Sequence, residues 1–177
     1  MTDSFAHALR LDQIRDGARL EINADEEEKR RIAKRLALVS LHSLAAYAAL
    51  SRQPGDIVRA QGRLQAKLDQ SCVVTGEPVP AHIDEPFDLL FVPEPKSRSA
   101  DDEIELGEDE LDTIFHDGSA IDLGGAIADT LALSLDPYPR SAGADAALKE
   151  AGVLAEEEAS PFAALAALKS KLGGNAP

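Results

Sequence analysis

Residues 58–91 decide the fold, and they read VRAQGRLQAKLDQSCVVTGEPVPAHIDEPFDLLF. The even positions from Val58 to Val74 hold small or apolar side chains, apart from Gln70, while the odd positions are polar or charged along most of the run. A period of two over this length predicts a strand with one buried face and one solvated face. Cys72, the only cysteine of the chain, is therefore expected to point inward.

The sequence TGEP at 75–78 predicts a turn, and an apolar row then resumes on the odd positions from Val79 to Phe91. A second strand that returns antiparallel to the first is expected. The expected cross-strand pairs are Val74 with Val79, Cys72 with Ala81, and Gln70 with Ile83. Pro80 and Pro86 lack a backbone N–H and favour an edge strand or a bulge.

Two segments outside this hairpin have helical patterns. Between positions 25 and 38 four acidic residues precede five basic ones, and Ile32 and Leu36 share a stripe, which predicts an amphipathic helix. Its basic cluster is either an RNA contact or a solvated face paired with its own acids. Asp122 is the expected N-cap of a second helix, with a leucine or isoleucine at every fourth position and a stop before Pro137.

These elements predict an α+β protein: an antiparallel sheet packed by an amphipathic helix, with an acidic mobile insertion and a helical C-terminal arm. The arm is expected to contain a weak helix over 144–156 and a capped helix from Ser160. The expected division is an α+β core with the long hairpin (1–93), an acidic linker (94–117), a helix and PYPR segment completing the core (118–140), and the helical arm (141–177).

The formal net charge of −14 is spread unevenly. Residues 94–117 alone hold ten acidic residues against two basic ones. Such a segment repels bare nucleic acid and attracts basic surfaces. The single cysteine excludes an internal disulfide framework, no basic start leads into an apolar run, and no stretch approaches about 20 apolar residues. A cytoplasmic location without a membrane segment is expected.

Cys72 is the main candidate for chemistry. A nucleophilic cysteine needs an exposed thiolate beside a base or a helix start, whereas Cys72 is expected on the apolar face and His82 on the opposite one. A structural zinc site needs four ligands, but Thr75 stands three residues after Cys72, and the histidines are scattered. The motifs of phosphate loops, serine hydrolases and zinc proteases are absent from the sequence.

We therefore expect no enzymatic activity, no cofactor and no metal, and we interpret Cys72 as a packed side chain. Structural roles are expected for Cys72, Pro78, Asp122, Pro137 and Pro139.

Two surfaces are candidates for binding a partner. Arg59, Arg63 and Lys67 share the outward face of one strand, where they either follow a phosphate backbone or ribosomal surface or form an ordinary solvated face. Because no aromatic residue stands among them, base stacking is not expected. Phe162 and Leu165 lie on one stripe of the C-terminal segment, which must be buried against the sheet or in a partner groove.

Four blocks follow one another along the chain: RLDQI, then CVVTGEPVPAHIDEPF leading to FVPE, then IDLG with a helix and DPYPR, and finally SPFAALAALK. In order and spacing they resemble the YceD-type family of large-ribosomal-RNA-subunit accumulation proteins. The resemblance implies a bacterial or organellar protein without established enzymatic activity that is needed for normal levels of large-subunit ribosomal RNA. Many members carry a second cysteine three residues after the first, where this chain has Thr75.

The resemblance leaves two mechanisms open. In the first, the Arg59, Arg63 and Lys67 face touches ribosomal RNA of the large subunit while the acidic linker contacts basic ribosomal proteins. In the second, the protein is an acidic chaperone or adaptor for a basic ribosomal protein or a processing enzyme. DNA and membranes are not expected partners. The alternatives from other classes are an interaction module unrelated to ribosomes and a cysteine-dependent enzyme.

Overall fold

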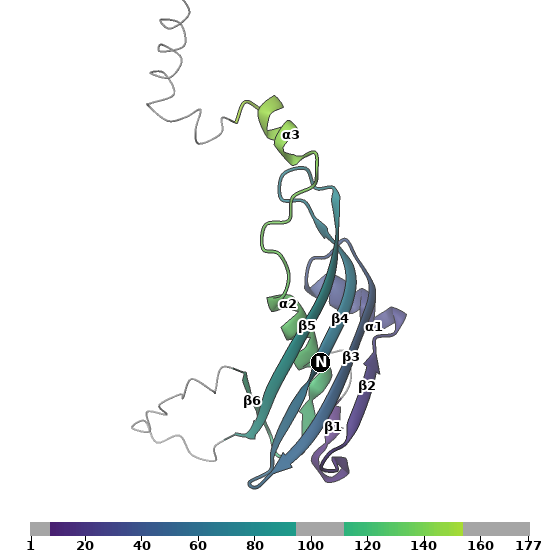
Figure 1. Ribbon diagram of the computed structural model, residues 1–177, viewed down its shortest axis with the longest axis vertical. Coiled ribbons are helices and arrows are strands. Elements are labelled where there is room, and N and C mark those ends of the chain that lie inside the picture. Colours follow the sequence, from purple (N-terminus) through teal and green to yellow (C-terminus); the bar gives the residue numbers. More distant parts are fainter. Residues whose placement is uncertain (1–7, 95–111, 154–177) are drawn as a thin grey trace, which may run out of the picture.

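The structure is a computed structural model that describes residues 8–94 and 112–153. Five strands form the main sheet, in the order β2-β3-β4-β5-β6 (Figure 1). Their bounds are Arg19–Asn23 for β2, Ser40–Gln53 for β3, Ile57–Ser71 for β4, Pro78–Pro93 for β5 and Thr113–His116 for β6. Neighbouring strands are antiparallel except β5 and β6, which are parallel. The predicted α+β fold with an antiparallel sheet is confirmed.

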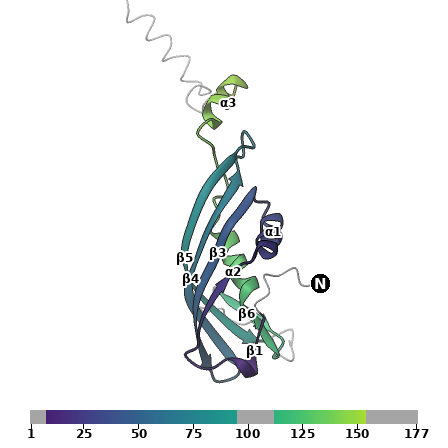
Figure 2. The same ribbon diagram turned by 90° about the vertical axis from the view of Figure 1, so that its right-hand side faces the viewer.

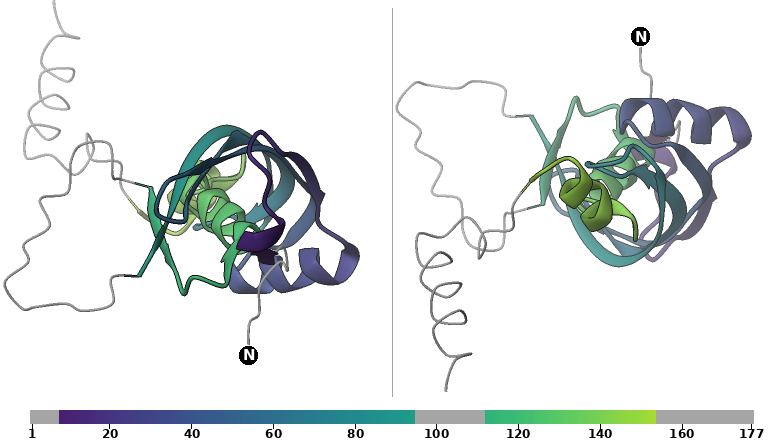
Figure 3. Two further views of the ribbon diagram at one scale, coloured as in Figure 1. Left: turned by 90° about the horizontal axis from the view of Figure 1, so that it is seen from below. Right: turned by 90° about the horizontal axis from the view of Figure 1, so that it is seen from above.

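Smaller elements surround this sheet. A two-stranded sheet pairs β1 (Ala8–Arg10) with β7 (Ala120–Asp122), and a short 3-10 helix, η1 (Leu11–Gln13), follows β1. The helices are α1 (Glu26–Arg35), α2 (Leu123–Leu133) and α3 (Ala144–Glu150). The long strands are bowed (Figure 2), and α2 lies in the hollow of the curved sheet when it is viewed from either end (Figure 3).

The predicted alternation of buried and exposed side chains is confirmed. Val58, Ala60 and Leu64 of β4 are fully buried, and on β5 the buried row is Phe87, Leu89 and Phe91. These rows line the concave face, together with Leu44, Ala46, Ala48 and Leu50 of β3. Because every second side chain points the other way, the intervening polar residues form the convex face of the sheet.

The predicted register of the hairpin is wrong by four residues. Gln70 pairs with Val79 and Ser71 with Pro78, so β4 ends one residue before Cys72. A six-residue loop over 72–77 replaces the expected tight turn, and it is closed by hydrogen bonds from Cys72 N to Glu77 O (2.8 Å) and from Gly76 N to Cys72 O (2.9 Å). Because side chains alternate with a period of two, a shift of four residues still pairs the buried side chains of β4 with the buried side chains of β5.

Two prolines inside β5, Pro80 and Pro86, lie where the edge of this strand away from β4 has no neighbouring strand among the described residues. Leu90 donates its N–H away from β4, to the carbonyl of Asp112 beside β6. Pro80 and Pro86 have the same parity as Leu90, so their missing donors would face the same side. The pairing with β6 begins only at Leu90, and among the described residues no strand lies on the side of either proline that faces away from β4. The expectation of an edge strand therefore holds for this part of β5, and no bulge occurs in its pairing with β4.

The helix that fills the concave face is α2. Asp122 is its N-cap residue, and the side chain accepts a hydrogen bond from Gly125 N at 2.9 Å. Leu123, Ile127 and Leu131 are completely buried. Small residues on both surfaces, such as Ala60 on β4, allow this helix to approach the sheet closely.

The amphipathic helix predicted over 25–38 is present but shorter. Asp25 caps α1 in a capping box with Glu28, and the helix ends at Arg35. Ala37 follows with a φ of 52°, in the left-handed region, which stops the helical path. Only Ile32 of this helix is buried, and α1 packs beside β3. It contributes less to the core than α2 does.

The acidic linker predicted over 94–117 lies mostly outside the described residues. Its described end contains β6, which adds a strand to the sheet. The C-terminal arm begins with α3, which ends at Glu150 and not at the predicted position 156. Phe162, Leu165 and the predicted helix from Ser160 lie outside the described residues. The domain boundaries stay a prediction.

Candidate functional site

Two of the three cations predicted on the convex face are ion-paired with β5. Arg59 donates from Nε to Asp88 Oδ1 at 2.7 Å and from Nη2 to Asp88 Oδ2 at 2.5 Å. Arg63 donates from Nε to Asp84 Oδ1. Hydrogen bonds from these guanidinium groups lower the pKa of Asp84 and Asp88 below the usual value. Both carboxylates are thus ionised at neutral pH, and both arginine charges are balanced.

Lys67, the third predicted cation, does not form an ion pair with β5 as the two arginines do. Arg59 and Arg63 each reach an aspartate that stands two residues before their direct partner on β5. Lys67 lies opposite His82, and the corresponding position is Pro80, which offers no carboxylate. Lys67 is exposed and has no ion pair with any described residue. One of the three predicted cations therefore remains available on this face.

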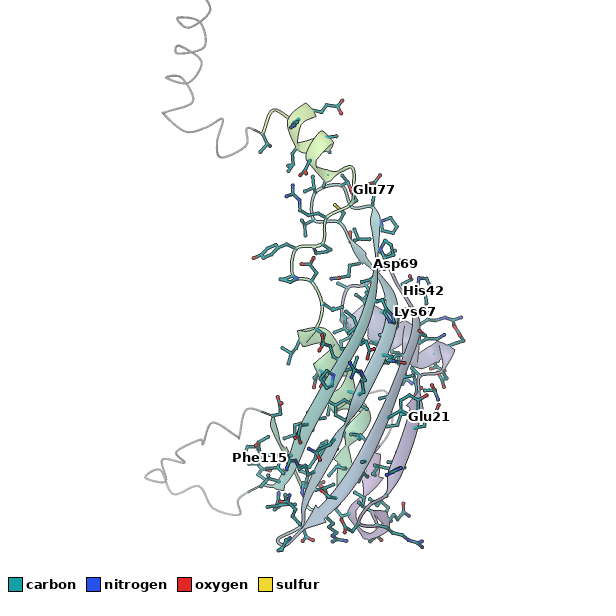
Figure 4. The ribbon with its side chains drawn as sticks, in the orientation of Figure 1. Glu21, His42, Lys67, Asp69, Glu77 and Phe115 are labelled. Carbon is teal, nitrogen blue, oxygen red and sulfur yellow. The ribbon has the colours of Figure 1, made fainter. Side chains whose placement is uncertain are left out.

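A polar cluster lies beside Lys67, where β3 carries a bulge between Leu41 and Ser43 (Figure 4). The extra residue is His42, whose Nε2 lies 2.8 Å from Asp69 Oδ2 and 3.1 Å from Ser40 Oγ. Ser40 Oγ also donates to Asp69 Oδ2 at 2.7 Å. The hydroxyl of Ser40 and then the ring of His42 lower the pKa of Asp69.

These three residue types occur in hydrolases, but the geometry differs from a catalytic triad. In a triad the histidine bonds the serine through one nitrogen and the carboxylate through the other. Here a single nitrogen of His42 faces both groups, and the carboxylate of Asp69 accepts a hydrogen bond from Ser40 directly. The arrangement fits a surface hydrogen-bond cluster that fixes the bulge.

Cys72 holds the hairpin loop against the segment between α2 and α3. Its Sγ accepts hydrogen bonds from the backbone N–H of Ser141 at 3.2 Å and of Thr75 at 3.4 Å. Val73 N donates to the carbonyl of Pro139 at 2.9 Å. The donated hydrogen bonds, that of Ser141 first, lower the pKa of the Cys72 thiol to about 6. Cys72 is only 3 % exposed, so this thiolate is enclosed by backbone and is unlike an accessible nucleophile.

The other predicted structural residues lie at the ends of elements. Pro78 is the first residue of β5, and Asp122 caps α2. Pro137 follows the end of α2, and Pro139 is buried where its carbonyl receives the hairpin loop. The candidates Cys72 and Pro139 are thereby brought together, whereas Arg59 and Arg63 lie away from them, on the convex face of the sheet.

We expect the pH dependence of stability to identify the Cys72 thiolate. The folded-state pKa is about 6 against an ordinary value of 9.0, so ionisation favours the folded state. The contribution is absent below pH 6, grows as the pH rises towards 9, and is complete above 9. Thermal unfolding of the wild type and of Cys72→Ala across this range should show a difference that grows with pH. A difference that stays constant over the same range would contradict the assignment.

The histidines provide no metal site among the described residues, where no group of three His, Cys, Asp or Glu side chains is placed to hold an ion. His116 is buried and bonded on both nitrogens, with Nε2 3.0 Å from the carbonyl of Asp56 and Nδ1 accepting from Gly118 N. His82 is exposed opposite Lys67. Within the described part of the chain, no helix is long and apolar enough to cross a membrane.

Tyr47 is a surface residue that the sequence interpretation missed. The register of β3 places it directly opposite Arg63 and Glu21, and it is 51 % exposed. An aromatic ring therefore does stand among the charged side chains of the convex face. The sequence contains the information needed to place it. Leu44, Ala46 and Ala48 are alternate apolar residues of one buried row, so Tyr47 between them points to the opposite, outward face.

A family model matches residues 60–169, and its description is Large ribosomal RNA subunit accumulation protein YceD. Neither the search of curated proteins nor the search of solved structures gives a match. The matched span begins in β4 and includes the Cys72 loop, β5 and all of α2 and α3. The family name links its members to the accumulation of large-subunit ribosomal RNA. Because the match covers more than half of the chain and confirms the resemblance of the sequence blocks, this chain belongs to the YceD family of large ribosomal RNA subunit accumulation proteins.

Proposed function

We propose that this chain supports the accumulation of large-subunit ribosomal RNA as a non-enzymatic cytoplasmic factor that binds a basic ribosomal protein through the convex face of its sheet. Family membership supports the link to the large subunit. The choice of a protein partner rests on the charges of the convex face.

The observation that carries this choice is the pairing of Arg59 with Asp88 and of Arg63 with Asp84. Binding to RNA gains its strength from cations that neutralise phosphates and release counterions. An arginine already paired with a carboxylate contributes little to that, and the net charge of the chain is −14. A basic protein is attracted by the same field that repels a phosphate backbone.

A non-enzymatic role is supported by the two places where catalytic residue types meet. His42 faces Ser40 and Asp69 through one nitrogen, and the sulfur of Cys72 accepts hydrogen bonds from the backbone N–H groups of Thr75 and Ser141. A nucleophile also needs a base that can take its proton at an accessible position. The lowered pKa of Asp69 makes it a weak base for Ser40, and the backbone N–H groups that donate to Cys72 cannot take its proton.

Direct contact with ribosomal RNA is the second candidate function. It is favoured by Lys67 and by Arg30 and Lys34 of α1, which are exposed and have no ion pair with a described residue. These cations lie on the hairpin and on α1, and a strand of RNA that used Lys67 would meet Asp69, which stands two residues away on the same face of β4. The two candidates predict opposite effects of the same substitutions.

The test compares two variants of the full chain that change the convex face in opposite directions. Asp84→Asn with Asp88→Asn releases two arginine charges, whereas Arg59→Ala with Arg63→Ala releases two carboxylates. If the partner is a basic protein, the aspartate variant binds purified basic large-subunit proteins more weakly and the arginine variant more tightly. We expect about tenfold in each direction at low salt, because each exposed charge contributes of the order of 1 kcal/mol or less.

The reverse order, with the aspartate variant binding tighter to a fragment of large-subunit ribosomal RNA, would replace the proposal with the second candidate. Asp12→Asn with Asp145→Asn is the matched control, since both residues form exposed ion pairs away from the convex face. Equal binding by all variants to every ligand would exclude the convex face as the contact. Surface ion pairs add little to stability, so the variants should fold.

A further inference from the structure

We infer that a hollow between β2 and β3 on the convex face is the pocket in which an arginine or lysine side chain of the basic partner is anchored. This inference rests on the proposed function and adds a site to it. The hollow has a volume of about 400 Å³ and is lined by residues of β2, β3 and β4. Its parts are a short floor, an aromatic wall and a carboxylate at the rim.

The floor is Ala49. The register places Arg19 of β2 and Gln61 of β4 directly opposite Ala49, one on each side. A short side chain between two long ones leaves a depression in the face of a sheet. Because the lining is mostly apolar, the depression can hold the methylene stem of a long basic side chain while its charged end stays at the rim.

The wall is Tyr47, which stands two residues from Ala49 on the same face of β3 and is 51 % exposed. Its hydroxyl donates to Glu21 Oε1 at 3.3 Å, and this bond fixes the tilt of the ring. The face of an aromatic ring attracts a guanidinium or ammonium group within about 6 Å. A cation that enters along Ala49 would therefore meet the ring and the carboxylate together.

Glu21 is the carboxylate at the rim, on the edge strand β2 (Figure 4). It accepts hydrogen bonds from two neutral groups, Tyr47 Oη and Asn23 Nδ2, the second at 3.2 Å. No ion pair joins it to a described residue. Asp84 and Asp88 on the same face are already paired with arginines. Glu21 thus offers an incoming cation a negative charge without requiring an existing ion pair to break.

Arg19 also lines the hollow, and its positive charge determines whether its removal strengthens or weakens the binding of a given ligand. Its charge opposes an incoming basic side chain and favours an incoming phosphate. Removing it should strengthen the binding of a basic peptide and weaken the binding of RNA. The occupant we propose is the basic side chain, because Glu21 repels phosphate and the whole chain is strongly acidic.

The experiment measures the affinity of the full chain for a labelled short peptide of alternating arginine and glycine, by fluorescence anisotropy at low salt. Tyr47→Ala and Glu21→Gln should each weaken binding by about fivefold to tenfold, because a cation loses the ring or the carboxylate. Arg19→Ala should tighten it. Tyr138→Ala is the matched control, since Tyr138 is 74 % exposed elsewhere and should leave the affinity unchanged.

The unfolding midpoint of each variant is measured alongside, and Tyr47→Phe provides a second variant that keeps the ring and should lose much less affinity than Tyr47→Ala. Wild-type affinity in both Tyr47→Ala and Glu21→Gln would overturn the pocket. If peptide binding in that case still depended on Asp84 and Asp88, the proposed function would stand without the pocket. If the chain binds a labelled single-stranded RNA but not the peptide, and Arg19→Ala weakens the binding of the RNA, both the pocket and the proposed function are overturned.

Discussion

Replacing Gly62 with alanine is expected to destabilise the fold by about 3 kcal/mol, at the upper end of what overpacking usually costs. A Cβ atom at this position would lie 1.9 Å from the carbonyl oxygen of Tyr47 and 2.7 Å from Cζ of Phe87. The first contact is with backbone, so a rotamer change cannot relieve it. The chain needs glycine here because Gly62 lies directly opposite Phe87 in the hairpin, and the ring uses the space a side chain would take.

Denaturant unfolding of Gly62→Ala against the wild type measures this effect. Gly143→Ala is the control, since its added Cβ would meet only Glu77 Oε2 at 3.8 Å among the atoms nearby. That control should change the free energy of unfolding by less than about 0.5 kcal/mol. Equal stabilities of the Gly62 and Gly143 variants would mean that β3 and β4 are not paired as described.

Phe91→Ala should cost about 3 to 5 kcal/mol, the usual range for deleting a fully buried aromatic side chain. Phe91 is 0 % exposed and is paired with Val58 on β4 and with Ile114 on β6. Its ring therefore lies where the chain returns to the sheet after the acidic segment. The cavity left by alanine would weaken the attachment of β6 as well as the core.

The measurement is again denaturant unfolding, with hydrogen exchange of the β6 amides as a second readout. Phe115→Ala supplies the control, because Phe115 lies on β6 at 50 % exposure and its loss leaves no internal cavity (Figure 4). A cost below about 1 kcal/mol for Phe91→Ala, or β6 amides as well protected as in the wild type, would contradict the described pairing of β5 with β6.

The alternation of side chains predicted which faces of β4 and β5 are buried, because burial selects every second residue whatever the partner strand is. It did not predict the register. The loop over 72–77 is set by hydrogen bonds from Ser141 to Cys72 and from Val73 to Pro139, which join segments far apart in sequence. Turn composition at 75–78 contains no information about these contacts.

The same limit applies to the candidate site. Arg59 and Arg63 were identified correctly as outward residues, but their charges depend on Asp88 and Asp84, which only the register brings within reach. Tyr47 was missed because the strand that carries it, β3, was not predicted from the sequence. Short strands such as β1 and β7 were not predicted, since three residues are too few for a period to be recognised.

In the proposed function, the convex face of this YceD family member binds a basic protein and thereby supports the accumulation of large-subunit ribosomal RNA. The most direct measurement is the ratio of large-subunit to small-subunit ribosomal RNA in cells whose own copy is replaced by a variant. We expect Asp84→Asn with Asp88→Asn to lower this ratio towards that of cells lacking the protein, and Arg59→Ala with Arg63→Ala to preserve it. A normal ratio with the aspartate variant, present at wild-type levels, would contradict the claim.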